Sequence, residues 1–175
     1  MPVRAVVTGG AGFIGSHLVE ALVDGGHEVA VIDTFTPYYE RTSKQANVDP
    51  WRDRATLHEV DLRTDALEGV LEGAEVVFHL AAQPGVRQSW EIFATYVEHN
   101  LVATQRLLDA ARVVGVGRVV AASSSSVYGN APTYPTREDD PLCPHSPYGV
   151  TKRAMEDLAR AHAANWGTHT VLLRY

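Results

Sequence analysis

Hydrophobic positions along the chain fall into short apolar runs separated by segments in which apolar residues recur at helical spacing. The runs are rich in β-branched residues and too short for helices, which is typical of buried strands. They predict six strands, at Val3–Val7, His27–Asp33, Ala55–Val60, Glu75–Leu80, Arg118–Ala122 and Thr168–Leu173.

The segments between the strands predict helices. After the first strand, Phe13, Ile14 and Leu18 share one helical face, and Gly25 is a suitable C-cap. Before the last strand, Ser146 and Pro147 form a favourable helix start. The predicted helices lie at Gly12–Val23, near Glu40–Asn47, at Asp65–Leu71, at Ile92–Val114, and from Ser146-Pro147 to Asn165.

Strands that alternate with helices in this way predict an α/β fold. Two successive βαβαβ halves give a Rossmann-type, doubly wound parallel sheet with strand order 3-2-1-4-5-6 and helices on both faces. At 175 residues the chain is one domain. Ligands should bind where strands one, four and five end.

Composition narrows the choice of partners and location. The net charge is −6 and the basic residues are scattered, which argues against a nucleic-acid surface. A single cysteine, Cys143, is compatible with a reducing cytosol, and neither a secretory signal nor a membrane-spanning run is visible. We therefore expect a cytoplasmic protein without membrane contact. The histidine spacing predicts no metal site.

Three glycines follow the first strand at three-residue spacing: Gly9, Gly12 and Gly15. The first allows a sharp turn, the second lets a pyrophosphate approach the backbone, and the third permits close helix packing. The helix that begins here aims its free N–H groups at the phosphates. The turn, including Phe13 and Ile14, is thus predicted to bind a dinucleotide; a tight strand-to-helix turn without ligand is the alternative.

Acidic and small residues at the other strand ends extend this prediction. Asp33 and the adjacent Thr34 lie about 24 positions beyond Gly9, where a carboxylate accepts both ribose hydroxyls and favours NAD over NADP. Asp61-Leu62 is a candidate adenine contact, with a turn-capping Asp61 as the alternative. After strand four, Leu80-Ala81-Ala82 lets the cofactor lie against the backbone, although tight packing alone would also explain it.

Tyr148 and Lys152 lie four residues apart at the start of the last helix and therefore share one face. An ammonium group beside a phenol lowers the phenol pKa, so Tyr148 could take a proton from a sugar hydroxyl. The serine cluster Ser123–Ser126 closes strand five and could bring a hydroxyl to the same oxygen. The alternative for Tyr148 and Lys152 is that they lie on a solvated helix face without a catalytic role.

Together these motifs resemble the extended short-chain dehydrogenase/reductase family, and within it the NAD-dependent nucleotide-sugar epimerases and dehydratases. The resemblance implies that Tyr148 is the catalytic base and that Lys152 binds the nicotinamide ribose and tunes Tyr148. It also implies that Ser124 hydrogen-bonds the reacting sugar hydroxyl, while Asn100 helps hold the cofactor. The matching stretches are TGGAGFIGSHL (8–18), Asp33, Asp61-Leu62, LAAQPGVRQS (80–89), Asn100, SSSSVYG (123–129) and SPYGVTK (146–152).

The resemblance also narrows the reaction. Dehydratases of the family carry an Asp-Glu pair where this chain has Ser125 and Ser126, so the chain looks like a 4-epimerase, with a dehydratase as a further alternative. In a 4-epimerase, Ser125 and Ser126 are expected to face the substrate. The stretches TPYYERTSKQANV and AAQPGVRQS look most like UDP-glucuronate 4-epimerases. We expect Arg87 to hold an anionic part of the substrate, unless it is a surface arginine.

Members of this family continue beyond the position of Tyr175 into a C-terminal substrate domain. The expectation is therefore that residues 1–175 form the NAD-binding domain and that the substrate domain is absent. Two interpretations stay open: the cofactor-binding portion of a UDP-sugar 4-epimerase, or an NAD-binding module without turnover. The family's homodimers pair through helices that match those of Asn100 and Tyr148. A chain without the substrate domain should also expose apolar surface.

Overall fold

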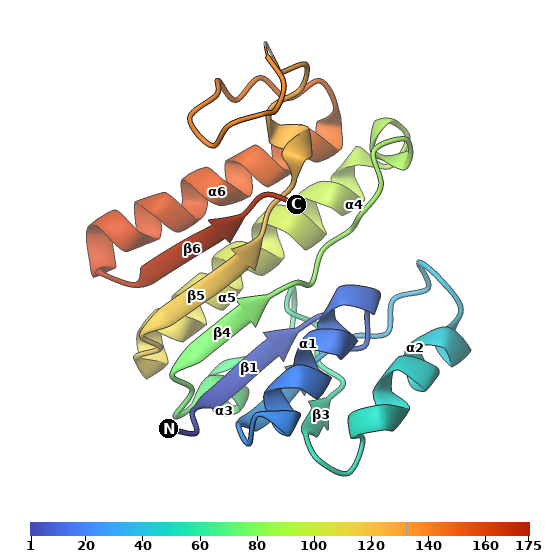
Figure 1. Cartoon of the computed structure of the whole chain (residues 1–175), viewed down its shortest axis with the longest axis vertical. Helices are drawn as coiled ribbons and strands as arrows, with labels where there is room; N and C mark the ends of the chain where they lie inside the picture. Colours follow the sequence, from blue (N-terminus) through green and yellow to red (C-terminus); the bar gives the residue numbers. More distant parts are fainter. Residues whose placement is uncertain (132) are drawn as a thin grey trace.

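In the computed structural model, six strands form one fully parallel sheet in the order β3-β2-β1-β4-β5-β6. The structure describes residues 1–131 and 133–175, so Pro132, in the irregular segment before the last helix, lies outside the described residues. The sheet confirms the predicted fold class and strand order (Figure 1). The strands are β1 (Arg4–Thr8), β2 (Glu28–Ile32), β3 (Thr56–His58), β4 (Val76–His79), β5 (Arg118–Ala122) and β6 (His169–Leu173).

The parallel register brings the carboxyl ends of the strands to one edge of the sheet. Thr8 at the end of β1 pairs with Ile32 on one side and with His79 on the other. The chain leaves β1 between β2 and β4, which is the point where the strand order reverses. A crevice therefore opens at this edge, next to the predicted glycine turn.

Helices cover the sheet on both faces. Near β1 and β2, α1 and α2 pack on one face, and α3, α5 and α6 pack on the other (Figure 1). The helices are α1 (Phe13–Asp24), α2 (Arg41–Val48), α3 (Glu68–Leu71), α4 (Phe93–Val97), α5 (Ala103–Val114) and α6 (Pro147–Trp166).

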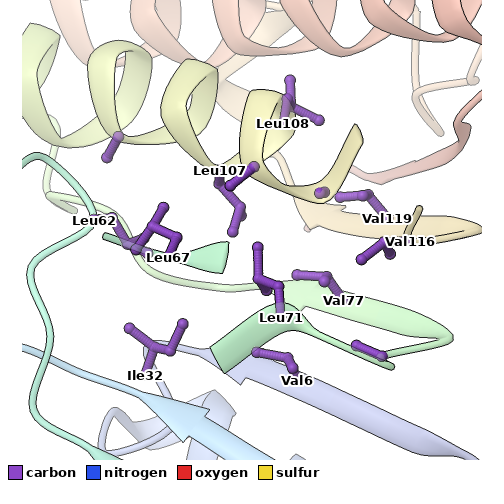
Figure 2. Packing of buried hydrophobic residues seen from close by; sticks show 14 of the residues in the cluster. Val6, Ile32, Leu62, Leu67, Leu71, Val77, Leu107, Leu108, Val116 and Val119 are labelled. Atoms are coloured by element: carbon purple, nitrogen blue, oxygen red, sulfur yellow. The ribbon is translucent and has the colours of Figure 1, made fainter. Parts of the chain in front are cut away.

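Alternating side chains of the central strands fill two apolar cores. Val6 of β1 points into the core beneath α3 and α5, whereas its neighbour Val7 points into the core beneath α1. Figure 2 shows the first core, in which Leu71 lies close to Val6 and Val77, and Leu107 points toward them from α5. Burial on both faces explains why these strands read as continuous apolar runs.

The helix predicted over Ile92–Val114 is not one regular α-helix. A π-helical turn, Glu98–Val102, separates α4 from α5. The turn carries Asn100, which is 1% exposed, and π-helical turns inside helices frequently occur at functional sites. Helical periodicity alone could not reveal the turn, because α4 has only five residues and is too short to show the change of phase that one extra residue causes.

The face of β4, β5 and β6 beside α1 carries an apolar hollow of about 150 Å³. The hollow is lined by Ile14, Leu18, Phe78, Leu80, Val120, Ala122, Leu173 and Tyr175. Of these residues, Leu173 and Tyr175 are exposed. Within the described ranges, no helix combines the length and apolar character that crossing a bilayer requires.

The core of Figure 2 predicts a large cost for shortening a central side chain. Leu107 is fully buried on α5, so Leu107→Ala should destabilise the fold by about 2–5 kcal/mol through lost burial and a residual cavity. The control Val113→Ala, on the exposed face of the same helix, should cost no more than about 0.5 kcal/mol. Urea unfolding followed by circular dichroism measures both, and equal costs would contradict this description of the core.

Candidate active site

A cavity of about 340 Å³ lies at the carboxyl edge of the sheet, between the ends of β1, β2, β4 and β5. It brings together most of the residues predicted to bind a cofactor, although they are distant in sequence. The predicted residues that line it are Gly9, Gly12, Phe13, Ile14, Gly15, Asp33, Thr34, Asp61, Leu62, Leu80, Ala81, Ala82, Tyr148 and Lys152.

The glycine turn forms the floor of this cavity and leaves no room for side chains. Gly9 has φ of +73°, and a Cβ atom there would lie 2.7 Å from the backbone nitrogen of Ala81. A Cβ atom on Gly15 would collide with the carbonyl oxygen of Gly9. Gly12 is the N-cap of α1 and has no side-chain capping partner. The turn therefore presents bare backbone and a helix N-terminus, which fits a pyrophosphate.

Asp33, the predicted ribose ligand, is buried and already holds several partners. Its carboxylate accepts hydrogen bonds from the backbone N–H groups of Ala11 (3.2 Å) and Phe35 (2.8 Å), and it pairs with the ammonium of Lys44 (3.0 Å). The Asp33 and Lys44 side chains are 6% and 7% exposed. Phe35 has a φ of +49°, a backbone conformation that is unfavourable for a bulky residue. These contacts fix the carboxylate at the cavity wall.

Asp61, the predicted adenine contact, is paired with Arg63. The Arg63 guanidinium donates to both carboxylate oxygens, with its shortest contact at 2.7 Å, and it also reaches Glu98 at 3.2 Å. Hydrogen bonds from Arg63 hold the pKa of Asp61 below its ordinary value, although partial burial opposes them. Asp61 thus lines the cavity as a carboxylate with a fixed orientation.

His79 forms a buried chain of hydrogen bonds beneath the cavity. Thr104 Oγ1 donates to the carbonyl of Asn100 (2.8 Å), so it must accept from His79 Nε2 (2.9 Å). On the other side, Thr8 Oγ1 accepts from the N–H of Ala81 (3.2 Å) and donates to His79 Nδ1 (2.8 Å). Burial lowers the pKa of His79 to about 3, so the ring is neutral. The neutral His79 ring thus links the ends of β1 and β4 to α5.

Asn100 connects the loop after β4 to α6. Its side chain accepts from the backbone N–H of Gln83 (2.8 Å) and donates to the Gln83 carbonyl (3.2 Å) and to Thr151 Oγ1 (3.1 Å). Thr151 Oγ1 donates in turn to the Tyr148 carbonyl (2.8 Å). Asn100 does not line the cavity; it anchors the segments that do.

Tyr148 and Lys152 both line the cavity from the first two turns of α6. Lys152 is 4% exposed and donates to the Ala122 carbonyl (2.9 Å), and burial lowers its pKa to about 8. Burial also raises the pKa of Tyr148, and a hydrogen bond with Ser124 opposes that rise. The expected lowering of the Tyr148 pKa by Lys152 is therefore wrong for this structure, because burial dominates and the group that lowers this pKa is Ser124 rather than Lys152.

The predicted substrate contacts lie outside the cavity: Ser124, Ser125, Ser126 and Arg87. Of the serine cluster, Ser123 lines it, while Ser124, Ser125 and Ser126 do not. Ser124 directly follows Ser123 of the cavity wall, and its side chain lowers the pKa of Tyr148. Arg87 is exposed on the segment that follows β4.

The cavity also contains residues that sequence reasoning missed. Tyr38 and Tyr39 come from the connection between β2 and α2, Lys44 from α2, and His99 from the π-helical turn. No local pattern marks Tyr38 or Lys44, because the path of an irregular connection decides whether they reach the sheet edge. His99 precedes Asn100 in the polar run Glu98-His99-Asn100. That run inside an otherwise apolar helix was the signal from which His99 could have been predicted.

The chain belongs to the NAD dependent epimerase/dehydratase family, whose model matches residues 5–175. This confirms the resemblance predicted from the motifs, and the family is one of enzymes. The predicted cofactor, NAD, is confirmed as the cofactor of the family.

Individual relatives agree with this assignment. An uncharacterized UDP-glucose epimerase of Bacillus subtilis, YtcB, is 44% identical over 98% of this chain and 55% of its own length. The crystal structure of UDP-glucuronic acid 4-epimerase from Bacillus cereus with UDP-glucuronic acid and NAD has a TM-score of 0.93 and 39% identity, covering 98% and 56%. The hexosamine 5,6-dehydratase TunA has a TM-score of 0.83 and 35% identity, covering 98% and 54%. The chain spans about half the length of these relatives.

Lys152 predicts an unusual pH dependence of stability. Its pKa falls from 10.5 to about 8 on folding, so the buried charge destabilises the fold below about pH 8 and the cost vanishes as pH approaches 10.5. Lys152→Met should therefore be more stable than the wild type at pH 7 by about 1–3 kcal/mol, with a smaller difference at pH 10.

Urea unfolding at the two pH values measures this difference, and Lys44→Met provides the matched control. Lys44 is also buried but pairs with Asp33, so its removal leaves a buried carboxylate unpaired and should destabilise the fold at both pH values. A Lys152→Met variant that is less stable than the wild type at pH 7 would contradict the account.

Proposed function

We propose that this chain is the NAD-binding portion, residues 1–175, of a nucleotide-sugar 4-epimerase that acts on a UDP-sugar. The observation that carries the proposal is the common cavity of the glycine turn and the Tyr148-Lys152 pair, beside Ser124. The bare backbone at Gly9 and the fixed carboxylate of Asp33 fit the pyrophosphate and the adenosine ribose of NAD. The similarity to epimerases that bind UDP-sugars supports the substrate class.

In this proposal Tyr148 accepts the proton of the sugar 4-hydroxyl while the C4 hydrogen leaves as hydride. Bound NAD⁺ supplies the hydride acceptor and a positive charge that favours the phenolate. Ser124 bridges the sugar hydroxyl and the phenol, and Lys152 binds the nicotinamide ribose. The 4-keto sugar then rotates and takes the hydride back on its other face, while Tyr148 returns the proton, so both configurations at C4 are reached.

UDP-glucuronate is the proposed substrate within this class. The similarity to the Bacillus cereus epimerase in complex with UDP-glucuronic acid and NAD supports this choice. In the proposal Arg87 pairs with an anionic part of the substrate, and Ser125 and Ser126 face the sugar. Asp61 and Leu62 contact the adenine, and Asn100 holds the cofactor side of the site through its contacts with Gln83.

Two neighbouring functions are separated by specific observations. The TunA similarity keeps a dehydratase in view, but Ser125 and Ser126 offer neither the acid nor the base that elimination needs. Because the chain spans about half the length of its relatives, NAD binding without turnover is the second candidate. A cytoplasmic location and a homodimer through the helices of Asn100 and Tyr148 remain predictions.

Removing the Tyr148 hydroxyl tests the assigned base. Tyr148→Phe should slow conversion of UDP-glucuronate to UDP-galacturonate by about 10²–10⁴-fold, because general base catalysis is lost, while NAD affinity stays near that of the wild type. Chromatography of the UDP-sugars and calorimetric NAD titration measure the two effects. The control is Tyr134→Phe, whose ring is 82% exposed. Full activity in Tyr148→Phe would refute the assignment of the base. If the wild-type chain binds NAD but does not convert the UDP-sugar, the non-catalytic module is favoured.

Truncating Arg87 tests the recognition of the acidic sugar. Arg87→Ala should raise the KM for UDP-glucuronate roughly ten-fold, the effect of losing one charged hydrogen bond, and leave kcat and the KM for UDP-glucose unchanged. Arg118→Ala, at the opposite end of the sheet, is the control. Steady-state kinetics with both sugars decide the matter, and an equal change for both sugars would exclude this role.

A further inference from the structure

Glu156 is a fully buried carboxylate that the proposed reaction does not use. It lies on α6 one turn beyond Lys152, so Tyr148, Lys152 and Glu156 follow one another along a single helix face. A carboxylate without solvent is costly unless all of its acceptor positions are occupied. The burial of Glu156 therefore requires strong partners.

Those partners come from three different segments. The Glu156 carboxylate accepts from Ser123 Oγ (2.6 Å), from Arg174 Nε (2.9 Å) and Nη2 (2.8 Å), and from Arg160 Nη2 (2.6 Å). The side chain of Arg174 is 15% exposed, whereas that of Arg160 is 46% exposed. Burial opposes ionisation, but these hydrogen bonds hold the pKa of Glu156 below its ordinary value. The carboxylate is thus charged and fully paired.

Arg174 extends the network to the far end of the serine segment. Its Nη1 donates to the Tyr128 hydroxyl (2.8 Å) and to the Glu138 carbonyl (3.0 Å), and its guanidinium lies 5.0 Å from the centre of the Tyr128 ring. Glu156 and Arg174 together therefore hold Ser123 at one end of the 123–128 segment and Tyr128 at the other. An apolar pair of similar volume could fill the space, so burial alone does not explain this arrangement.

Ser124 lies between these fixed points, in a segment that packs against the start of α6 beside Tyr148, since a Cβ atom on Gly149 would lie 2.6 Å from the Ser126 carbonyl oxygen. The Ser124 side chain also lowers the pKa of Tyr148. Its own backbone neighbours are also fixed, because Ser123 N donates to the Leu173 carbonyl (2.7 Å) and Ser125 N to the Tyr175 carbonyl (2.6 Å). Ser124 Oγ accepts from Ser126 N (3.1 Å), which sets its rotamer. The position of the Ser124 hydroxyl therefore depends on where its segment is held.

We propose that Glu156 and Arg174 are positioning residues that hold the Ser123–Tyr128 segment so that Ser124 stays beside Tyr148. The catalytic meaning of this placement rests on the proposed function, but the placement itself does not require turnover. Glu156 acts on Ser124 through Ser123, and Arg174 acts through Tyr128. Neither residue touches the cavity.

The test reads the Tyr148 phenol directly. Replacing Tyr148 with 3,5-difluorotyrosine brings its titration nearer to neutral pH, and fluorine NMR then follows the pKa of this one residue. Ser124→Ala should raise that pKa, because the hydrogen bond that lowers it is lost. The proposal predicts that Ser123→Ala and Glu156→Gln raise it as well, and that Ser124→Ala adds little in the Ser123→Ala background.

The sign of the shift separates positioning from simple electrostatics. Removing a negative charge by Glu156→Gln would by itself lower a phenol pKa, so an increase reports the displaced hydroxyl. Asp157→Asn is the matched control, since it removes the same charge from an exposed neighbour on α6 and should leave the pKa unchanged. If Glu156→Gln does not fold, Ser123→Ala decides alone.

An unchanged or lowered Tyr148 pKa in Ser123→Ala would overturn the proposal, as would a full additional effect of Ser124→Ala in that background. The titration is readable whether or not the chain converts a UDP-sugar. Failure of the positioning proposal is thus distinguishable from failure of the proposed function.

Discussion

The close approach of the glycine turn to the end of β4 is the constraint on which the site depends. Gly9 turns out of β1 with a positive φ and touches the backbone of Ala81, and Gly15 packs against the Gly9 carbonyl. Any side chain at these positions would separate β1 from β4 or lift α1 from the sheet. The same bare backbone that allows this packing is the surface on which a pyrophosphate can rest, so stability and binding share one cause.

Buried polar networks then set the positions of the groups around the turn. The neutral His79 chain joins the ends of β1 and β4 to the π-helical turn, and Asn100 continues it to α6. On the other side, Glu156 and Arg174 join α6 to the serine segment. Because each acceptor in these networks needs a specific donor, they favour one arrangement of strands and loops rather than merely filling space.

Much of this architecture could be predicted from the sequence, because it depends on local patterns. Short β-branched apolar runs placed the strands, period-3.6 patterning placed the helices, and the glycine spacing placed the turn beside the correct strand. The ion pair of Lys44 with Asp33 and that of Arg174 with Glu156 could not be predicted, since they join segments 11 and 18 residues apart through irregular or edge geometry. The Tyr148 pKa was wrongly predicted because spacing reveals neighbouring charges but not burial.

The central claim is that the glycine turn and Tyr148 serve one bound dinucleotide. The most direct test is a crystal structure of this chain with NAD⁺. The account predicts the pyrophosphate over the Gly9–Gly12 backbone, the adenosine ribose at Asp33, and the nicotinamide ring beside Tyr148 and Lys152. A vacant turn at saturating NAD⁺, or a nicotinamide ring remote from the phenol, would contradict it.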